Sequence, residues 1–401
     1  MTGHLHSFIQ NKTARAVGII FACCGFIFGS WASLIPFVKE KFHLDEAQLG
    51  LLLLSMPLGS LVFNPVSVIF IRRYGSVLVS LIAVIIMGLS FMLPILLPSV
   101  VLVATALVLA GASFSVTNVA MNTCASTLEE TSDIRIMSTC HGMWSLGAMG
   151  GALFSGLSLH PLEACCNSLL PPQSLYVILQ ANLVIIIVLF IRNHFHSIAS
   201  LHSKLEDAPK MNWRSFKPGK ELWMIISICI CSYLTEGTMA DWSAVYLREI
   251  TQASETIAGR GFAVYALFMA VGRFVGDALI ARFGNMRVLR AGGVLVVLGL
   301  LTVVASQTHF MAMPGFMLVG AGISLASPIL YQASARVKGL APGVGLATMN
   351  TFAMAAFLGG PVLIGFVAQT SNLRIAFAVV ALVAVVWVLQ THRIVRNQTN
   401  E

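Results

Sequence analysis

Long uncharged stretches separate the charged residues of this 401-residue chain, and they restrict its fold more than any motif does. A helix that crosses a lipid bilayer needs about 20 apolar residues. Two stretches, 76–128 and 291–335, are long enough to cross twice, with return points at Pro98 and at Gln307-Thr308-His309. The other stretches, which each cross once, are 16–38, 47–71, 137–162, 164–191, 222–235, 261–272, 339–373 and 375–392. The sequence therefore predicts an all-α membrane protein with twelve transmembrane helices.

The composition also indicates a membrane protein. Hydrophobic residues make up 57% of the chain and charged residues 10%, and the mean hydropathy is +0.86. In soluble domains about a quarter of the residues are charged. The hydrophilic first dozen residues lead into an apolar stretch that is too long for the core of a signal peptide. We therefore expect the first helix to be retained in the membrane.

The chain contains one pattern twice, in the same order. Trp31 and Gly50 precede Trp242 and Gly261 by 211 residues (242 − 31 and 261 − 50). Later glycines recur at an offset of 209 residues (320 − 111), as Gly111 with Gly320, Gly150-Gly151 with Gly359-Gly360, and Gly156 with Gly365. Duplicated membrane proteins form their solute site where the two halves meet. We predict two pseudo-symmetric six-helix halves, 1–192 and 220–401, joined by a polar linker, 193–219.

Basic residues indicate the orientation, because short cytoplasmic loops are enriched in Lys and Arg. Placing both termini and the linker in the cytoplasm leaves only a few basic residues on the outer side: Lys39, Lys41, Arg248, Arg260 and Arg374. The net charge of +8 then reflects topology, and the expected partner is anionic membrane lipid. No basic run is interleaved with aromatic residues, so nucleic acid is not expected as a partner.

Signatures of enzymes and of ATP-driven pumps are absent from the sequence. It contains no Walker loop, no Gly-x-Ser-x-Gly elbow and no pair of His residues at metal-ligating helical spacing. The cysteines form no CxxC motif; six lie in or beside predicted helices, and Cys165-Cys166 lie in a predicted outer loop. We expect no enzyme activity, no cofactor and no metal, which leaves an ion gradient as the energy source.

Several segments resemble a known family. Arg72-Arg73-Tyr74-Gly75 and Arg282-Phe283-Gly284, after predicted helices 2 and 8, resemble motif A of the major facilitator superfamily. The usual acidic residue three positions before the motif's Gly is replaced here by Arg72 and Ala281. The stretches 29–36, 118–122, 141–142 and 240–247 resemble a branch of bacterial inner-membrane permeases akin to the fucose permease group. The resemblance implies the major facilitator fold, solute transport and a location in the bacterial inner (cytoplasmic) membrane.

Features present in only one half are candidates for function, because features shared by both halves serve the scaffold. Glu236 aligns with Gly25 and Asp241 with Ser30, so both carboxylates are additions to the repeat. A charge inside a span costs roughly 2.5 to 3.5 kcal/mol on insertion scales and is rarely kept without a partner or an aqueous cavity. We expect Glu236 to bind and release a coupling proton; the alternative is a structural acid bonded to a neighbouring helix. Asp241 is a second candidate for the proton.

Charged residues near helix ends are candidates for gates. Arg273 and Asp277 lie four residues apart on predicted helix 8, on one face and close enough for an ion pair. A pair that forms in one state and breaks in the other biases alternating access. For Asp241 the structural alternative is an ion pair with Arg248 or Arg260 that closes the outer side.

Polar residues on predicted helices 4 and 10 are candidates for solute contact. Ser115, Asn118 and Asn122 fall on one helical stripe, and the repeat places Ser327 and Tyr331 on the same stripe of helix 10. The resemblance implies that helices 1, 4, 7 and 10 line the cavity. The alternative is packing between helices, which also uses small and hydroxyl residues.

Other repeated features have both a functional and a structural interpretation. His141 aligns with Asn350 near the starts of helices 5 and 11, either in the site or as satisfied structural groups. Trp31 and Trp242 suit the membrane interface, unless they face inward, where Trp242 could stack on a solute ring. The glycine clusters 147–151 and 359–361 predict close helix packing with a kink.

We predict a secondary active transporter that moves a small polar organic solute, such as a sugar, by alternating access and proton-coupled uptake. Its expected partners are the solute, the proton and membrane lipid, and we expect a monomer. Asn and Ser on the stripes favour a polar solute, whereas the many Met and Phe residues favour the alternative, proton-driven efflux of a lipophilic metabolite or drug. A second alternative is a sensor with a transporter fold that binds its ligand without moving it.

Overall fold

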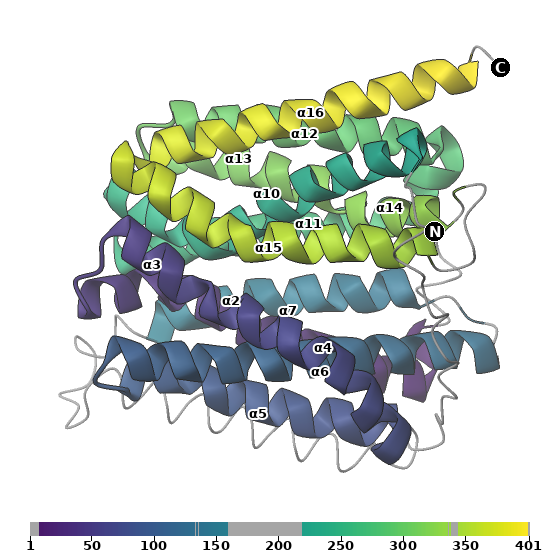
Figure 1. The fold of residues 1–401 in the computed structure, drawn as a ribbon, viewed down its shortest axis with the longest axis horizontal. Helices are drawn as coiled ribbons and strands as arrows, with labels where there is room; N and C mark the ends of the chain where they lie inside the picture. The colour runs from purple at the N-terminus through teal and green to yellow at the C-terminus, as the bar shows by residue number, and fades with distance from the viewer. Residues whose placement is uncertain are drawn as a thin grey trace.

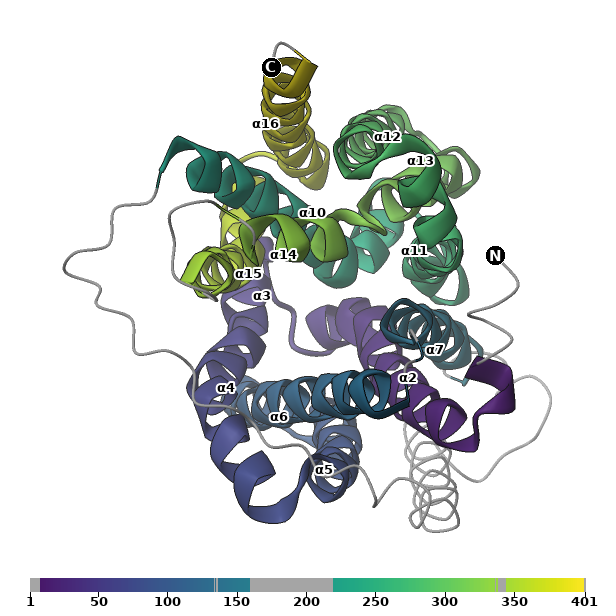
Figure 2. The same cartoon turned by 90° about the vertical axis from the view of Figure 1, so that its right-hand side faces the viewer.

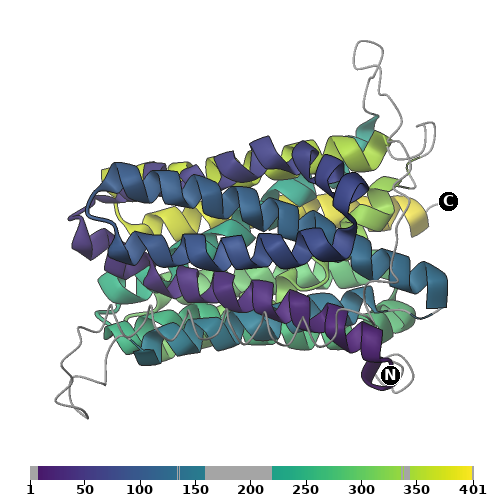
Figure 3. The same cartoon turned by 90° about the horizontal axis from the view of Figure 1, so that it is seen from below.

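The structure, a computed structural model, describes residues 8–132, 134, 136–158, 219–335, 337 and 344–399. Helices make up these ranges almost entirely, and they run side by side along the long axis of the molecule (Figures 1 and 3). Their bounds are α2 (Lys12–Lys41), α3 (Glu46–Leu53), α4 (Ser55–Tyr74), α5 (Ser76–Leu96), α6 (Val100–Ser132), α7 (Met137–Ser158), α10 (Lys220–Ile250), α11 (Glu255–Phe283), α12 (Asn285–Ala305), α13 (His309–Ile323), α14 (Ala326–Ala335), α15 (Val344–Thr370) and α16 (Leu373–Thr399).

Most of these helices are long and apolar enough to span a membrane, and 10 candidate spans are found within the described ranges. One of them combines α3 with α4, which meet at Leu54, and another combines α13 with α14, which meet at Ser324-Leu325. Helix α7, which is outside those 10, packs between α2 and α11 (Figure 2). The predicted sixth helix at 164–191, with Cys165-Cys166, and nearly all of the linker 193–219 lie outside the described residues.

The helix boundaries follow the predicted turn signals. Pro98 lies between the end of α5 and the start of α6, and Gln307-Thr308 separate α12 from α13, so both predicted return points are confirmed. The Thr308 hydroxyl caps α13 by accepting a hydrogen bond from the Met311 N–H at 3.4 Å. Asp45 and Gln48 form a capping box at the start of α3, which satisfies N–H groups that the first helical turn leaves free.

The two motif A segments have the same local structure, which supports the predicted duplication. Gly75 ends α4 with φ +83° and Gly284 ends α11 with φ +80°. Glycine adopts this region without the penalty that a Cβ would bring. Before each glycine, an Arg guanidinium lies over the neighbouring ring: Arg73 over Tyr74 at 5.4 Å and Arg282 over Phe283 at 5.2 Å.

The helices form two groups, which we call the N half (α2–α7) and the C half (α10–α16). Viewed along the bundle, α7 lies against α11 on one side and α3 lies against α15 on the other (Figure 2). The described chain begins and ends at one end of the bundle, the termini end, as Figure 3 shows. The opposite end, where α2 and α10 finish, is called the far end below.

Glycines join α2 to α7 without space for side chains. A Cβ on Gly25 would lie 1.9 Å from the Trp144 carbonyl oxygen, and one on Gly151 would lie 1.9 Å from the Phe26 carbonyl oxygen. A Cβ on Gly29 would lie 2.0 Å from the Ala148 carbonyl oxygen, and one on Gly147 would lie 2.0 Å from the Ala22 carbonyl oxygen. The predicted close packing of the 147–151 cluster is therefore confirmed, and α2 and α7 are in backbone contact along several turns.

The matching cluster in the C half does not pack in this way. Among the described residues, a Cβ on Gly359 would meet nothing within 4 Å, and one on Gly360 would meet only the Leu234 side chain at 3.4 Å. The prediction of close packing by the 359–361 cluster is therefore wrong for its two glycines, whereas the Pro361 carbonyl oxygen lies 2.6 Å from where a Cβ on Gly50 of α3 would be. Gly365 packs closely as well, since its Cβ would lie 2.5 Å from the Glu46 carbonyl oxygen of α3. These close backbone contacts of α15 are with the other half of the protein.

Candidate functional site

Glu236 lies at the middle of α10, where the repeat has Gly25 in α2. In the N half the backbone of α7 fills the space beside Gly25, whereas the glycines of α15 leave α10 without such contacts. The Glu236 side chain is half-buried and makes no hydrogen bond or ion pair with the described residues. The charged group that acts on it is Arg273 of α11, which attracts the ionised carboxylate.

Arg273 connects the two halves. Its Nη1 donates hydrogen bonds to the His141 carbonyl oxygen at 3.1 Å and to Ser145 Oγ at 2.6 Å, both on α7. The Ser138 hydroxyl, also on α7, donates to the Arg273 carbonyl oxygen at 2.9 Å. These bonds join Arg273 of the C half to α7 of the N half. The Asp277 side chain lies outside the described side chains, so the Arg273–Asp277 pair stays a prediction.

His141 contacts Arg273 through its backbone carbonyl group and not through its imidazole. Its ring packs edge-on against Phe21, with centroids 5.3 Å apart and an interplanar angle of 75°. Among the described residues its side chain makes no hydrogen bond, while its carbonyl oxygen accepts from Arg273. This environment favours the structural interpretation of the imidazole.

Tyr331 and Asn350, predicted separately, lie together in a small polar network. The hydroxyls of Tyr233 and Tyr331 are 2.6 Å apart, and the Tyr331 hydroxyl donates to Asn350 Oδ1 at 3.4 Å. Tyr233 was not predicted, although it lies three residues before Glu236 and thus on a neighbouring part of the same face of α10. Through Tyr233, the network includes α10, the helix that carries Glu236.

In the predicted stripe on α6, the two asparagines are hydrogen-bonded to each other. The Asn122 amide donates to the carbonyl oxygen and to Oδ1 of Asn118, both at 2.8 Å. Ser115 is buried with 5% exposure, and Asn118 and Asn122 are half-buried. Neither amide is within hydrogen-bond distance of Ser327 or Tyr331 in the described chain. In this conformation no hydrogen bond among the described residues joins the two predicted stripes.

The tryptophans are interior residues. Trp242 is fully buried and Trp31 is 2% exposed, with its ring 5.6 Å from that of Phe91. The prediction that they lie at the membrane interface is therefore wrong, because other helices surround α2 and α10 at these positions. The Trp242 Nε1–H has no hydrogen-bond partner within the described part of the chain. Asp241, one residue earlier, is half-buried and shows no ion pair or hydrogen bond there.

Charged side chains join the halves at the far end, and sequence reasoning missed them. Lys39 of α2 forms ion pairs with Glu249 of α10 and, at 3.0 Å, with Glu46 of α3. Arg248 of α10 pairs with Glu40 of α2 at 2.8 Å. Among the described residues Arg248 therefore pairs with Glu40, and the alternative of an ion pair between Asp241 and Arg248 or Arg260 is not found. We call these five residues the far-end cluster.

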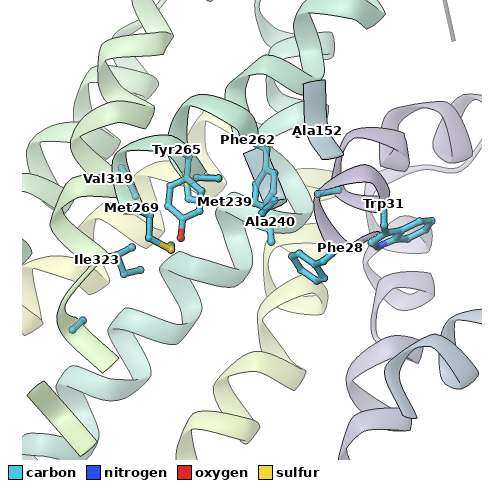
Figure 4. Close-up of a cluster of buried hydrophobic side chains, with 14 of the residues drawn as sticks. Phe28, Trp31, Ala152, Met239, Ala240, Phe262, Tyr265, Met269, Val319 and Ile323 are labelled. Atoms are coloured by element: carbon cyan, nitrogen blue, oxygen red, sulfur yellow. The ribbon is translucent and has the colours of Figure 1, made fainter. Parts of the chain in front are cut away.

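Aromatic rings cross the seam between the far-end cluster and Glu236. Phe28 of α2 packs with Phe114 and Trp144 of the N half, at centroid distances of 5.6 and 5.7 Å. Its ring is also 6.3 Å from that of Phe262 in α11, which in turn is 5.8 Å from Tyr265. Figure 4 shows Phe262 between Phe28 and Tyr265. These rings form an apolar layer across the seam.

Comparisons with known proteins give the family. A sequence model of the Major Facilitator Superfamily matches residues 17–249 and 230–398. An uncharacterized MFS-type transporter of Yersinia pestis is 32% identical over 368 residues, which cover 91% of each chain. The solved structure of a bacterial homologue of the human lysosomal transporter Spinster, inward-facing and occupied, is similar with a TM-score of 0.72 at 14% identity, over 95% of this chain and 96% of that one.

A further structural relative is the E. coli fucose:proton symporter FucP, with a TM-score of 0.58 at 17% identity, over 94% of this chain and 97% of that chain. At these identities the structural likeness concerns the fold, and the family follows from the sequence matches. The fold is that of secondary transporters and not of an enzyme. The chain therefore belongs to the Major Facilitator Superfamily and is a multi-pass membrane transporter.

Proposed function

We propose that the protein takes up a small polar organic solute of the sugar class together with protons. It works as a monomer in a bacterial inner (cytoplasmic) membrane, with both termini in the cytoplasm and the polar segment 193–219 as the linker between its halves. The observation that carries the proposal is Glu236, a half-buried carboxylate without a bonded partner among the described residues. Ionisable groups inside a membrane are rarely kept without a function.

Arg273 provides a physical route from the Glu236 charge to the arrangement of the halves. An ionised Glu236 attracts Arg273, and a protonated Glu236 no longer does so. Arg273 is also bonded to His141 and Ser145 on the opposite half. Protonation at Glu236 therefore changes the balance of forces on a contact across the seam, which is how a bound proton can bias one conformation over another.

The contacts at the far end support a conformation that is closed there. The far-end cluster, the Gly365–Glu46 backbone contact and a hydrogen bond from the Glu46 N–H to Gln369 Oε1 at 3.2 Å all join the halves at that end. With cytoplasmic termini, the far end faces outward. Loading from outside then requires these contacts to open, and unloading requires the α7–α11 contacts near Arg273 to open.

The polar side chains of the described interior favour a neutral, hydroxyl-bearing solute. The Tyr233–Tyr331–Asn350 network and the Asn118–Asn122 pair supply both donors and acceptors without fixed charge. Aromatic rings such as Phe28 and Trp144 can cover the apolar face of a sugar ring. The likeness to a fucose:proton symporter is consistent with this class of solute.

The test is gradient-driven uptake by Glu236→Gln in proteoliposomes, with L-fucose, D-galactose and D-glucose as radiolabelled probes. The amide imitates the protonated acid, so we expect loss of accumulation under an inward proton gradient while exchange of the same sugar persists. Glu221→Gln is the matched control, because Glu221 is exposed in the first turn of the same helix. Accumulation by Glu236→Gln at the wild-type level would rule out proton coupling through this carboxylate.

The aromatic layer favours the second candidate, efflux of a lipophilic compound. Phe28, Phe114, Trp144 and Phe262 offer a continuous apolar surface that spans both halves. Proteoliposomes loaded with a lipophilic dye distinguish the two functions. Proton-driven loss of the dye without accumulation of any sugar would support efflux, and sugar binding without flux in either direction would support a sensor.

A further inference from the structure

Tyr265 of α11 has a buried hydroxyl that lacks a partner. The residue is 2% exposed, and its Oη makes no hydrogen bond with the described residues. A phenol can donate one hydrogen bond and accept others. Buried polar groups are nearly always bonded, because an unpaired one loses its hydration without compensation. Among the described residues nothing compensates for the hydration that this hydroxyl has lost.

Packing does not require a hydroxyl at this position. The Tyr265 carbonyl oxygen lies 2.2 Å from where a Cβ on Gly320 would be, and the Met56 carbonyl oxygen lies 1.8 Å from where one on Gly111 would be. These two contacts are equivalent in the repeat, since 265 − 56 and 320 − 111 both give 209. The backbone contact is thus shared by both halves, whereas the hydroxyl, like Glu236, is present only in the C half.

The surroundings of Tyr265 connect it to the transport path. Its ring packs on Phe262, which touches Phe28 of the N half across the seam (Figure 4). A separation of α2 from α11, which loading from the outer side would require, would open the contact between Phe28 and Phe262 next to Tyr265. Tyr265 also lies about two helical turns before Arg273 on α11, on the same side of that helix.

We propose that the Tyr265 hydroxyl determines solute specificity by forming a hydrogen bond with a hydroxyl or carbonyl group of the transported solute. The inference rests on the proposed uptake of a polar solute. A site built to bond a solute hydroxyl rejects analogues that lack it far more strongly than an apolar pocket can, because the protein group is otherwise left unpaired. Among the described residues, Tyr265 Oη has no hydrogen-bond partner that would compete with a solute group.

Tyr265→Phe tests the proposal, with Tyr246→Phe as the matched control. Tyr246 is fully buried as well, but its hydroxyl donates to the Val303 carbonyl oxygen at 2.8 Å. Without solute, Tyr265→Phe should unfold at or above the wild-type temperature, since it removes an unpaired group, and Tyr246→Phe should unfold at a lower temperature. For L-fucose, D-galactose or D-glucose, whichever the wild type binds, Tyr265→Phe should weaken binding about tenfold or more and Tyr246→Phe should not.

Several outcomes would overturn the proposal. Unchanged sugar affinity in Tyr265→Phe would remove the hydroxyl from solute recognition. A lower unfolding temperature without solute, comparable to that of Tyr246→Phe, would assign the hydroxyl a structural partner. An altered pH profile of transport at unchanged affinity would assign it to Glu236 instead. A wild-type protein that binds none of these sugars would overturn the proposed solute class and this inference together, whereas the other outcomes leave the proposed function intact.

Discussion

Charge reversal in the far-end cluster should change which end of the transporter is open. Two ion pairs join the halves there, Lys39–Glu249 and Arg248–Glu40, and the exposed fractions of their side chains range from 12% to 47%. Pairs of this exposure are worth about 0.2 to 1 kcal/mol each after screening by solvent. Together they favour closure by about 0.4 to 2 kcal/mol, which is roughly a twofold to thirtyfold change in the ratio of the two states.

The single variant Lys39→Glu faces two carboxylates, Glu46 and Glu249, and should shift the population toward the state open at the far end by at least this factor. Adding Glu249→Lys restores one lysine between two carboxylates and should return the population to the closed state. Arg287→Glu is the control, since Arg287 is exposed near the termini end. A charge change there should leave the far end unaltered.

Distances between spin labels at the far end measure this population. Leu96, where α5 ends, and Met311, near the start of α13, are exposed and belong to different halves, so labelled cysteines there report the separation in a background without native cysteines. The effect of Lys39→Glu should shrink at high salt, because partly exposed charges are screened. An unchanged distance distribution at low salt, or a double variant no closer to wild type than the single one, would refute a role for these pairs in closure.

Two further predictions concern packing and the polar network. Gly29→Ala places a methyl group about where the Ala148 carbonyl oxygen lies, with 2.0 Å between them, and should destabilise the protein by about 1–3 kcal/mol in thermal unfolding. The methyl group of Gly359→Ala meets no atom of the described residues within 4 Å, so this variant should be tolerated, and equal losses in both variants would contradict the packing argument. Tyr331→Phe leaves Tyr233 and Asn350 without their shared partner and should weaken solute binding by about 1–3 kcal/mol in calorimetry. Wild-type affinity in that variant would make Tyr331 a packing residue.

The fold was predictable because its signals are local. Uncharged stretches mark the helices, Pro98 marks a reversal, and glycines at equal offsets mark the duplication, as the matching φ angles of Gly75 and Gly284 confirm. The burial of Trp31 and Trp242 was not predictable in this way. Tryptophan near a helix end suits both an interface and an interior, and only the neighbouring helices decide between them.

The candidate site was predictable where the halves differ. Comparing the halves identifies Glu236 opposite Gly25, and the same comparison could have identified Tyr265 opposite Met56. The far-end cluster was missed because the charged residues near these helix ends were interpreted only as signals of orientation in the membrane. Its signal was still present, since charged neighbours, Lys39-Glu40 and Arg248-Glu249, end the equivalent helices of both halves. Their pairing depends on how the halves meet, which no local pattern encodes.

The unequal glycine packing of the two halves has a consequence for protein engineering. The glycines of α2 that face α7 cannot be replaced by larger residues, since any side chain at Gly25 or Gly29 would collide with a carbonyl oxygen. Helix α10 meets α15 through side chains, so size and polarity can vary there while the backbone stays in place. Libraries that aim to redirect the transporter to new solutes should therefore diversify the α10–α15 face and keep the α2–α7 face unchanged.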